Sequence, residues 1–280
     1  EEKLQAFDAF IESLQLPLNK IEPKLVGSGM RIGAFATEDL DVGDAYISLP
    51  PNAVIDVTTA LATVDPTSAL AALLKKYSNN SKDGFDALVL YLLHERFVIK
   101  AQSQWWPYLN LFPTIDELIE YHPLFFKLEE IDRHLAGSDV RQSIVRYQRR
   151  AAERHKALLS DLDANLVLGS DVLLDRQMVY WATAIVDSRS IWWGGKRHLS
   201  PLLDLVNADS KGHPHETNLE DSEDMQQKVA VTRASRRVQK GEQIFENYGQ
   251  PNYLLFTYHG FLLEENTDDC ALLDGLFIHR

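Results

Sequence analysis

The sequence predicts an α+β protein in which one β-framework is divided by a helical insertion. Residues 24–57 consist of short strand-like pieces separated by Gly and Pro. The middle of the chain has the apolar spacing of helices, and the strand-like texture returns after Ser200. Strands at both ends of a chain with helices between them are typical of an α+β arrangement.

The first part of the chain supplies one helix and then strands. Apolar residues recur at helical spacing over residues 1–14, and Pro17 and Pro23 end this pattern. Residues 42–44 read as a turn, and a strand is expected over 46–49, before Pro50.

The middle and the end of the chain complete the pattern. Thr114, followed three residues later by Glu117, predicts a capped helix start. Helices are expected over residues 67–77, 85–99, 114–121, 139–162 and 175–191, and strands over 229–232 and 242–245. We therefore divide the chain into an N-terminal helix (1–22), a first framework part (23–84), a helical insertion (85–174) and a second framework part (175–280).

The charge, the cysteine content and the length of the apolar stretches exclude several classes of protein. The 280 residues carry 28 basic and 41 acidic side chains, a net charge of −13, which disfavours a nucleic-acid binder and suits either a cationic partner or simple solubility. The single cysteine, Cys270, excludes an intramolecular disulfide and a cysteine-based zinc site. The longest apolar stretches are too short to span a bilayer, so we expect an intracellular protein without a membrane partner.

Two segments carry candidate binding residues. Residues 27–34 are glycine-rich and include Met30, Arg31 and Ile32, but no helix follows at the spacing of a dinucleotide site, and an ordinary β-turn explains them equally. Ser188 and Arg189 end an apolar helix. They could hold a ligand carboxylate, or the arginine could satisfy the helix carbonyls.

Two later segments carry further candidate site residues. Asp204 and Asn207 lie three apart in the apolar run PLLDLVN, and buried polar groups of this kind need partners. Tyr248 ends the segment GEQIFENYG, which is followed by YHGF at residues 258–261. Its hydroxyl could face a cleft, or the ring could serve packing alone.

Together these segments, in this order and across this insertion, resemble a SET-domain protein methyltransferase. The resemblance is to the branch with a split SET domain, of the Rubisco large-subunit lysine methyltransferase and actin-histidine methyltransferase type. It spans nearly the whole chain, and Trp106-Pro107-Tyr108-Leu109 with Phe112-Pro113 supports it. It implies a SET-domain β-framework with a knot-like C-terminal segment, formed by residues 23–84 and 175–280.

The resemblance also implies a cofactor and a reaction. S-adenosylmethionine would donate a methyl group to a side-chain nitrogen of a protein substrate, most directly lysine, with Tyr248 as the catalytic residue. Histidine as the target, or a non-catalytic SET-like interaction module, are the alternatives. No metal site is implied. The implied cofactor-binding residues are Met30, Arg31, Ile32, Ser188, Arg189, Asp204, Asn207, Ala208 and Phe261.

Three features depart from the family pattern. Ala208 replaces the histidine that follows the asparagine, and Arg31 replaces the first glycine of the Gly-x-Gly loop. Many relatives also continue beyond Phe261 into a helical substrate-binding domain.

Two further features remain outside the resemblance. His213-Pro214-His215-Glu216 could suggest a metal site, but a solvated loop explains it better. Five arginines are expected to give the long helix a basic, exposed face: Arg141, Arg146, Arg149, Arg150 and Arg154.

Overall fold

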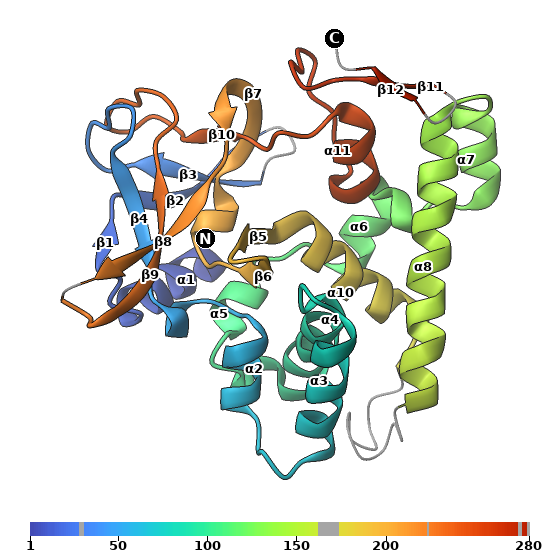
Figure 1. Cartoon of the computed structure of the whole chain (residues 1–280), viewed down its shortest axis with the longest axis horizontal. Helices are drawn as coiled ribbons and strands as arrows, with labels where there is room; N and C mark the ends of the chain where they lie inside the picture. Colours follow the sequence, from blue (N-terminus) through green and yellow to red (C-terminus); the bar gives the residue numbers. More distant parts are fainter. Residues whose placement is uncertain (28–30, 162–173, 223, 274–275, 279–280) are drawn as a thin grey trace.

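The largest sheet joins segments from the two ends of the chain. The computed structural model describes residues 1–27, 31–161, 174–222, 224–273 and 276–278. The antiparallel strands β1 (Leu18–Asn19), β4 (Ala45–Leu49), β9 (Gln227–Arg233) and β8 (Thr217–Ser222) form this sheet in that order. Because β4 pairs with β9 across the helical region, the two framework parts form one β-rich body (Figure 1).

Smaller strand pairs complete the β-framework and the C-terminal end of the chain. The pairs are β2 (Ile21–Leu25) with β3 (Ile32–Ala36), β5 (Ser190–Trp193) with β6 (Lys196–Leu199), β7 (Asn207–Pro214) with β10 (Phe245–Asn247), and β11 (Ala271–Leu273) with β12 (Leu276–Ile278). Because β10 runs parallel to β7, a hairpin cannot join these two strands, and the chain must cross over between them.

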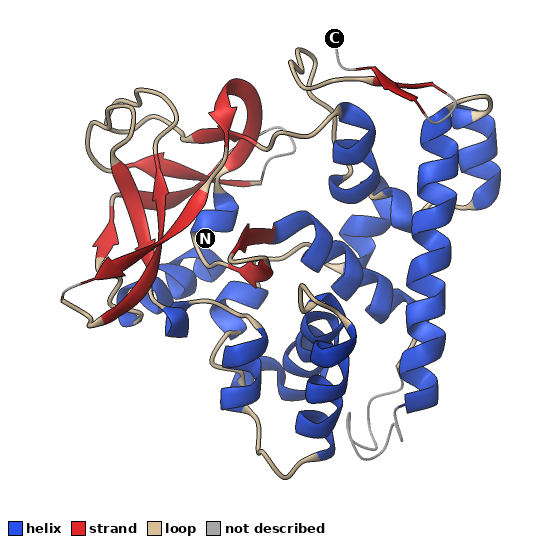
Figure 2. Ribbon diagram, in the orientation of Figure 1, coloured by secondary structure: helices blue, strands red, loops and turns tan. Residues whose placement is uncertain are grey.

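The helices gather on one side of the β-rich body (Figure 2). α10 lies at their centre and packs against α4, α8 and α11, while α1 packs against α5. The described α-helices are α1 (Glu2–Ser13), α2 (Val57–Thr63), α3 (Ala69–Asn80), α4 (Phe85–Leu93), α5 (Trp106–Leu109), α6 (Ile115–Tyr121), α7 (Leu128–Leu135), α8 (Asp139–Asp161), α10 (Arg176–Arg189) and α11 (Asn252–His259). Short helical turns are η1 (Pro51–Ala53), η2 (His94–Ile99), η3 (Lys100–Gln102), η4 (Pro123–Phe125) and η5 (Leu203–Leu205).

The core explains why α4 and α10 are apolar almost all round. Every residue of α4 except Asp86 is buried, and Trp181 of α10 is buried with its indole N–H donating to the Pro113 carbonyl at 2.7 Å. A helix that is apolar on all sides belongs in a core between other elements. These two helices therefore form the rigid support from which α10 presents its C-terminal residues.

Several expected elements are observed, with corrections at their ends. The predicted cap at Thr114 is present as a capping box with Glu117. The expected helix over 85–99 changes at His94 into the π-helical turn η2, and the helix expected to reach residue 191 ends at Arg189, where β5 begins. The strand expected over 242–245 begins only at Phe245, because Gln243 instead forms an isolated bridge with Phe35.

None of the described helices is long and apolar enough to cross a membrane. The division of the chain at residues 22, 84 and 174 stays a prediction.

Candidate active site

A buried cluster of Asp204, Arg189 and Tyr108 forms the centre of the site. The Arg189 Nη1 lies 3.1 Å from Asp204 Oδ2, and the Tyr108 hydroxyl donates to the same oxygen at 2.9 Å. Leu202, just before η5, has a left-handed φ of 72°, a strained backbone state for a branched side chain. This turn brings Asp204 under the C-terminal end of α10. Arg189 therefore pairs with Asp204 and does more than satisfy helix carbonyls.

Burial governs the charges of this cluster. It raises the pKa of Asp204 above its usual range, against the opposing effects of Arg189 and the Tyr108 hydrogen bond. Burial also opposes the charge of Arg189, but the carboxylate of Asp204 outweighs this and raises the arginine pKa. The second carboxylate oxygen, Asp204 Oδ1, is buried without a hydrogen-bond partner among the described residues. A buried acceptor left unpaired is costly, so it is available to a ligand donor.

A small cavity lies beside this unpaired oxygen. It has a volume of about 30 Å³ and is lined by Arg31, Ile32, Leu111, Arg189, Asp204, Leu205 and Asn207. Asn207 fixes one wall because its Nδ2 donates to the Ile32 carbonyl at 3.1 Å. The cavity can hold a small polar group such as an ammonium.

Arg31 shows why a glycine suits this loop. Its φ is 59°, in the left-handed region that glycine adopts without strain and other residues adopt at a cost of about 1 kcal/mol. The Arg31 guanidinium lies 3.4 Å from Glu117 Oε1 on α6. The chain thus keeps the glycine-like backbone conformation and adds an ion pair to α6. Met30 lies outside the described residues.

Tyr248 follows β10, and its hydroxyl bonds the segment that contains Leu205 and Asn207 of the cavity wall. Its hydroxyl donates to the Val206 carbonyl at 2.7 Å, and burial raises its pKa to about 12. The charges of Arg189 and Asp204 act on it with opposite signs. At neutral pH Tyr248 is therefore a protonated hydroxyl with a fixed orientation.

The last residue of α11, His259, lies beside Tyr248, and Phe261 lies beside His259. The ring centroid of His259 lies 5.7 Å from that of Tyr248 and 5.7 Å from that of Phe261. Burial lowers the pKa of His259 to about 4, and its ring bonds the Ser188 backbone. The Ser188 hydroxyl donates back to the Ala184 carbonyl at 2.7 Å. Ser188 therefore takes part in the site through its backbone.

A polar network sets the position of Tyr248 along β10. Glu246, two residues earlier, is opposite Ala208 in the β7–β10 pair and binds both the Tyr46 hydroxyl and His215. The interpretation of His215 as part of a solvated loop is wrong: β7 continues to Pro214, and this turns His215 inward. Sequence reasoning did not single out Glu246, although it lies in the segment GEQIFENYG, or Tyr46, which lies 200 residues earlier.

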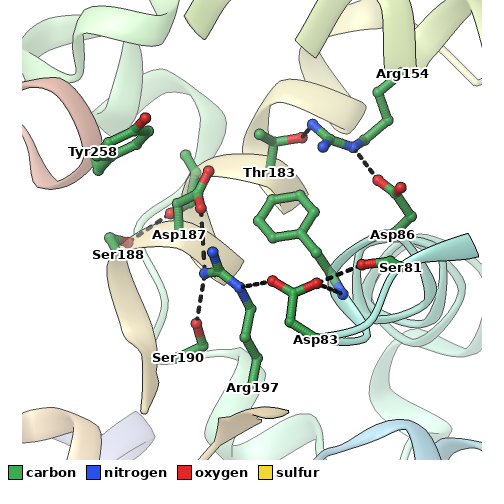
Figure 3. Close-up of polar contacts among 12 residues, drawn as sticks. Ser81, Asp83, Asp86, Arg154, Thr183, Asp187, Ser188, Ser190, Arg197 and Tyr258 are labelled. Atoms are coloured by element: carbon green, nitrogen blue, oxygen red, sulfur yellow. Dashed lines mark hydrogen bonds and ion pairs between the residues drawn. The ribbon is translucent and has the colours of Figure 1, made fainter. Parts of the chain in front are cut away.

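A larger cleft adjoins the catalytic candidate on another side. Its volume is about 460 Å³, and its walls come from α8, α10, α11, β5 and β6. His259, the neighbour of Tyr248, lines it, as does Asp187 at the end of α10 (Figure 3). Tyr248 is linked to the cavity through the carbonyl of Val206, which stands between Leu205 and Asn207 in the chain, and to the cleft through His259. No described group of three His, Cys, Asp or Glu side chains could hold a metal ion.

Comparison with known proteins finds similarity to N-lysine methyltransferases. No family model matches the chain. It is 26% identical over 280 residues to the N-lysine methyltransferase setd6 of Danio rerio, covering 93% of this chain and 57% of the relative. It is 26% identical to setd6 of Salmo salar, covering 96% and 60%.

Solved structures give the same result for the fold. Rubisco LSMT bound to AdoMet superposes with a TM-score of 0.76 at 17% identity, covering 97% of this chain and 59% of that one. The SET domain of LSMT bound to lysine and AdoHcy superposes with a TM-score of 0.76 at 17% identity, covering 93% and 57%. The chain spans less than two thirds of the length of each of these four proteins.

Proposed function

We propose that this chain, which has the SET-domain fold of the split-SET methyltransferases, transfers a methyl group from S-adenosylmethionine to a lysine side chain of a protein. The likeness to solved structures confirms the α+β framework with a helical insertion. The observation that carries the proposal is the position of Tyr248. Its hydroxyl bonds the carbonyl of Val206, which stands in the chain between the cavity residues Leu205 and Asn207, and its ring lies 5.7 Å from that of His259, which lines the large cleft.

The small cavity suits the amino-acid end of the cofactor. That end is a zwitterion, and the cavity offers one buried carboxylate oxygen without a partner, Asp204 Oδ1, beside the guanidinium of Arg189. Oppositely charged groups held in a buried site bind strongly through charge-assisted hydrogen bonds. We infer that Asp204, Arg189 and the backbone near Arg31 and Ile32 hold this end, with Asn207 keeping the wall in place.

When bound, the cofactor supplies an electrophilic methyl group on a sulfonium. The Tyr248 hydroxyl donates its hydrogen to the Val206 carbonyl. Its oxygen can therefore accept weak hydrogen bonds from a polarised methyl group. Burial and the fixed hydrogen bond organise this oxygen before the reaction, so no reorganisation is required at the transition state. The ring of His259 packs beside the tyrosine and is itself in contact with Phe261, so these side chains help to exclude water.

The cleft would admit the substrate side chain. Lysine is supported by the names of the relatives and by a neighbour bound to lysine. A lysine ammonium must lose its proton before it attacks, which costs about 4.6 kcal/mol at pH 7 from a pKa near 10.4. The chain's part is therefore to orient a rare neutral amine.

Calorimetry with S-adenosylmethionine tests the cofactor site. We expect the wild-type protein to bind it, and Asp204→Asn to weaken binding at least tenfold, because the amide cannot pair with both an arginine and a ligand ammonium. The matched control is Asp132→Asn on α7, which removes the exposed ion-pair partner of Arg141 on α8. This variant should bind S-adenosylmethionine as tightly as the wild-type protein. Circular dichroism checks that each variant is folded. An absence of binding by the folded wild-type protein would exclude the proposed activity.

The pH dependence of the rate separates lysine from histidine as the target. Tyr248, with its pKa near 12, and His259, with its pKa near 4, do not change protonation between pH 7 and pH 9. We therefore expect the rate of transfer to a protein extract to rise about tenfold per pH unit, since the neutral fraction of lysine rises in this way. A rate that is flat above pH 7 would indicate histidine, whose side chain is already neutral there.

A further inference from the structure

The large cleft beside Tyr248 contains three arginines whose pairing differs. Arg197 comes from β6, and Arg150 and Arg154 come from α8. Two carboxylates, Asp83 and Asp187, also line the cleft. Which of these charges is already neutralised within the protein decides what the cleft can bind.

Arg197 is fully engaged at the base of the cleft (Figure 3). Its Nε lies 2.9 Å from Asp83 Oδ2 and its Nη1 lies 3.3 Å from Asp187 Oδ1. The same Nη1 donates to the Ser190 hydroxyl at 3.1 Å. The guanidinium also lies over the rings of Phe85 and Trp192, at 4.7 and 4.5 Å. It therefore ties β6 to α10 and α4, and its charge is already balanced by two carboxylates.

Arg154 is likewise paired. Its Nε lies 2.6 Å from Asp86 Oδ1, its Nη1 lies 3.5 Å from the Thr183 hydroxyl, and its guanidinium stacks at 4.4 Å on Phe85 (Figure 3). Asp86 and Arg154 thus cancel each other's charge and join α4 to α8.

Arg150 is the exception. It lies one helical turn before Arg154 on the same face of α8, is exposed, and forms no ion pair with any described residue. Its neighbour Arg149, also exposed, does not line the cleft and lies 3.8 Å from Glu153. The basic face expected from the sequence therefore contributes one unpaired guanidinium to the cleft.

Resting on the proposed function, we propose that this cleft binds the part of the protein substrate next to the target lysine, and that Arg150 selects an Asp or Glu side chain there. An unpaired guanidinium at the edge of a partly enclosed site matches a carboxylate, which it can bind through two parallel hydrogen bonds. The chain as a whole has a net charge of −13 and repels acidic groups, so this local attraction would fix where such a group lies.

The aromatic walls fit the same occupant. The side chain of Trp192 is 48% exposed at the cleft, and Leu254 and Tyr258 lie on the α11 side. Such surfaces bury the apolar parts of a bound peptide, and arginine and aromatic residues dominate the energy of peptide interfaces. An extended segment passing through the cleft would place its lysine beside His259 and Tyr248 and its acidic residue at Arg150.

Direct binding of defined peptides tests this proposal. The probes are two sets of fluorescein-labelled peptides with one central lysine in an alanine–serine background. One set carries a single glutamate at successive positions around the lysine, and the other carries glutamine at the same positions. Fluorescence anisotropy is measured for the wild-type protein, Arg150→Ala, Arg150→Glu and the matched control Arg149→Ala.

We expect the wild-type protein to bind one or two glutamate peptides about tenfold more tightly than their glutamine counterparts. Arg150→Ala should abolish this preference, Arg150→Glu should reverse it, and Arg149→Ala should retain it. Equal binding of the two sets, no binding of either, or the same loss in Arg149→Ala and Arg150→Ala would overturn the proposal. The anisotropy experiment measures peptide binding and does not require methyl transfer. A protein that binds the peptides but transfers no methyl group would therefore contradict the proposed function and not this inference.

Discussion

We expect Tyr248→Phe to lower the rate of methyl transfer by a factor of about one hundred to one thousand. The substitution removes only the hydroxyl that donates to the Val206 carbonyl, and the ring can keep its packing against His259. Loss of one preorganised polar group at a reacting centre typically costs this much in rate. Single-turnover transfer of a labelled methyl group, at saturating S-adenosylmethionine, measures the effect.

A second tyrosine whose hydroxyl also bonds a backbone carbonyl serves as the control for this effect. Tyr180 on α10 also donates its hydroxyl to a backbone carbonyl, that of Gln148, at 3.4 Å, but this carbonyl belongs to α8 and not to the segment around Asp204. Tyr180→Phe should therefore lose only about 1 kcal/mol of stability and keep its rate. Undiminished transfer by Tyr248→Phe would remove the catalytic role of this residue.

The residues of the small cavity could be predicted because they lie in short motifs. Asp204 and Asn207 stand out as polar residues in an apolar run, and Arg189 stands out at the end of an apolar helix. Each had an ordinary structural explanation by itself. Their order along the chain resolved the ambiguity, and the structure places Arg31, Ile32, Arg189, Asp204 and Asn207 around one cavity.

The residues that position the site could not be found in this way. Glu246 is buried by contacts with Tyr46, 200 residues earlier, and with His215 in a segment that reads as polar loop. Such a contact depends on the parallel pairing of β10 with β7, which local sequence patterns do not encode. The switch to a π-helical turn at His94 is missed for a similar reason, because the apolar spacing of a helix continues through it.

Acidification supplies a prediction about stability that follows from four buried histidines. Burial lowers the pKa values of His122, His198, His215 and His259 to about 4. In the unfolded chain each imidazole has a pKa near 6.5, so the unfolded state binds more protons between these values. The stability that these residues contribute is complete above about pH 6.5 and is lost as the pH falls toward 4, by about 3 kcal/mol for each.

Two buried carboxyl groups act in the opposite direction. Burial raises the pKa of Asp187 to about 6, against the effect of Arg197, and raises that of Asp204 against the effects of Arg189 and Tyr108, so the folded state takes up these protons first. Protonation of Asp187 below pH 6 therefore stabilises the fold, by about 2 kcal/mol at pH 4. The four histidines outnumber these groups, and we expect a net loss of stability between pH 7 and pH 4. Urea unfolding at several pH values measures this loss, and a midpoint that rises on acidification would contradict it.

His122 shows why the charged form is excluded. The Leu124 N–H donates to its Nδ1 at 3.3 Å, and its Nε2 lies 3.1 Å from the Tyr258 carbonyl, an acceptor. Both bonds exist together only when Nε2 carries the single proton, and a second proton on Nδ1 would face the Leu124 N–H. In His122→Asn the amide oxygen can still accept from Leu124 but cannot titrate, so the loss of stability between pH 7 and pH 4 should fall by about 3 kcal/mol. His213→Asn, at an exposed position, is the matched control.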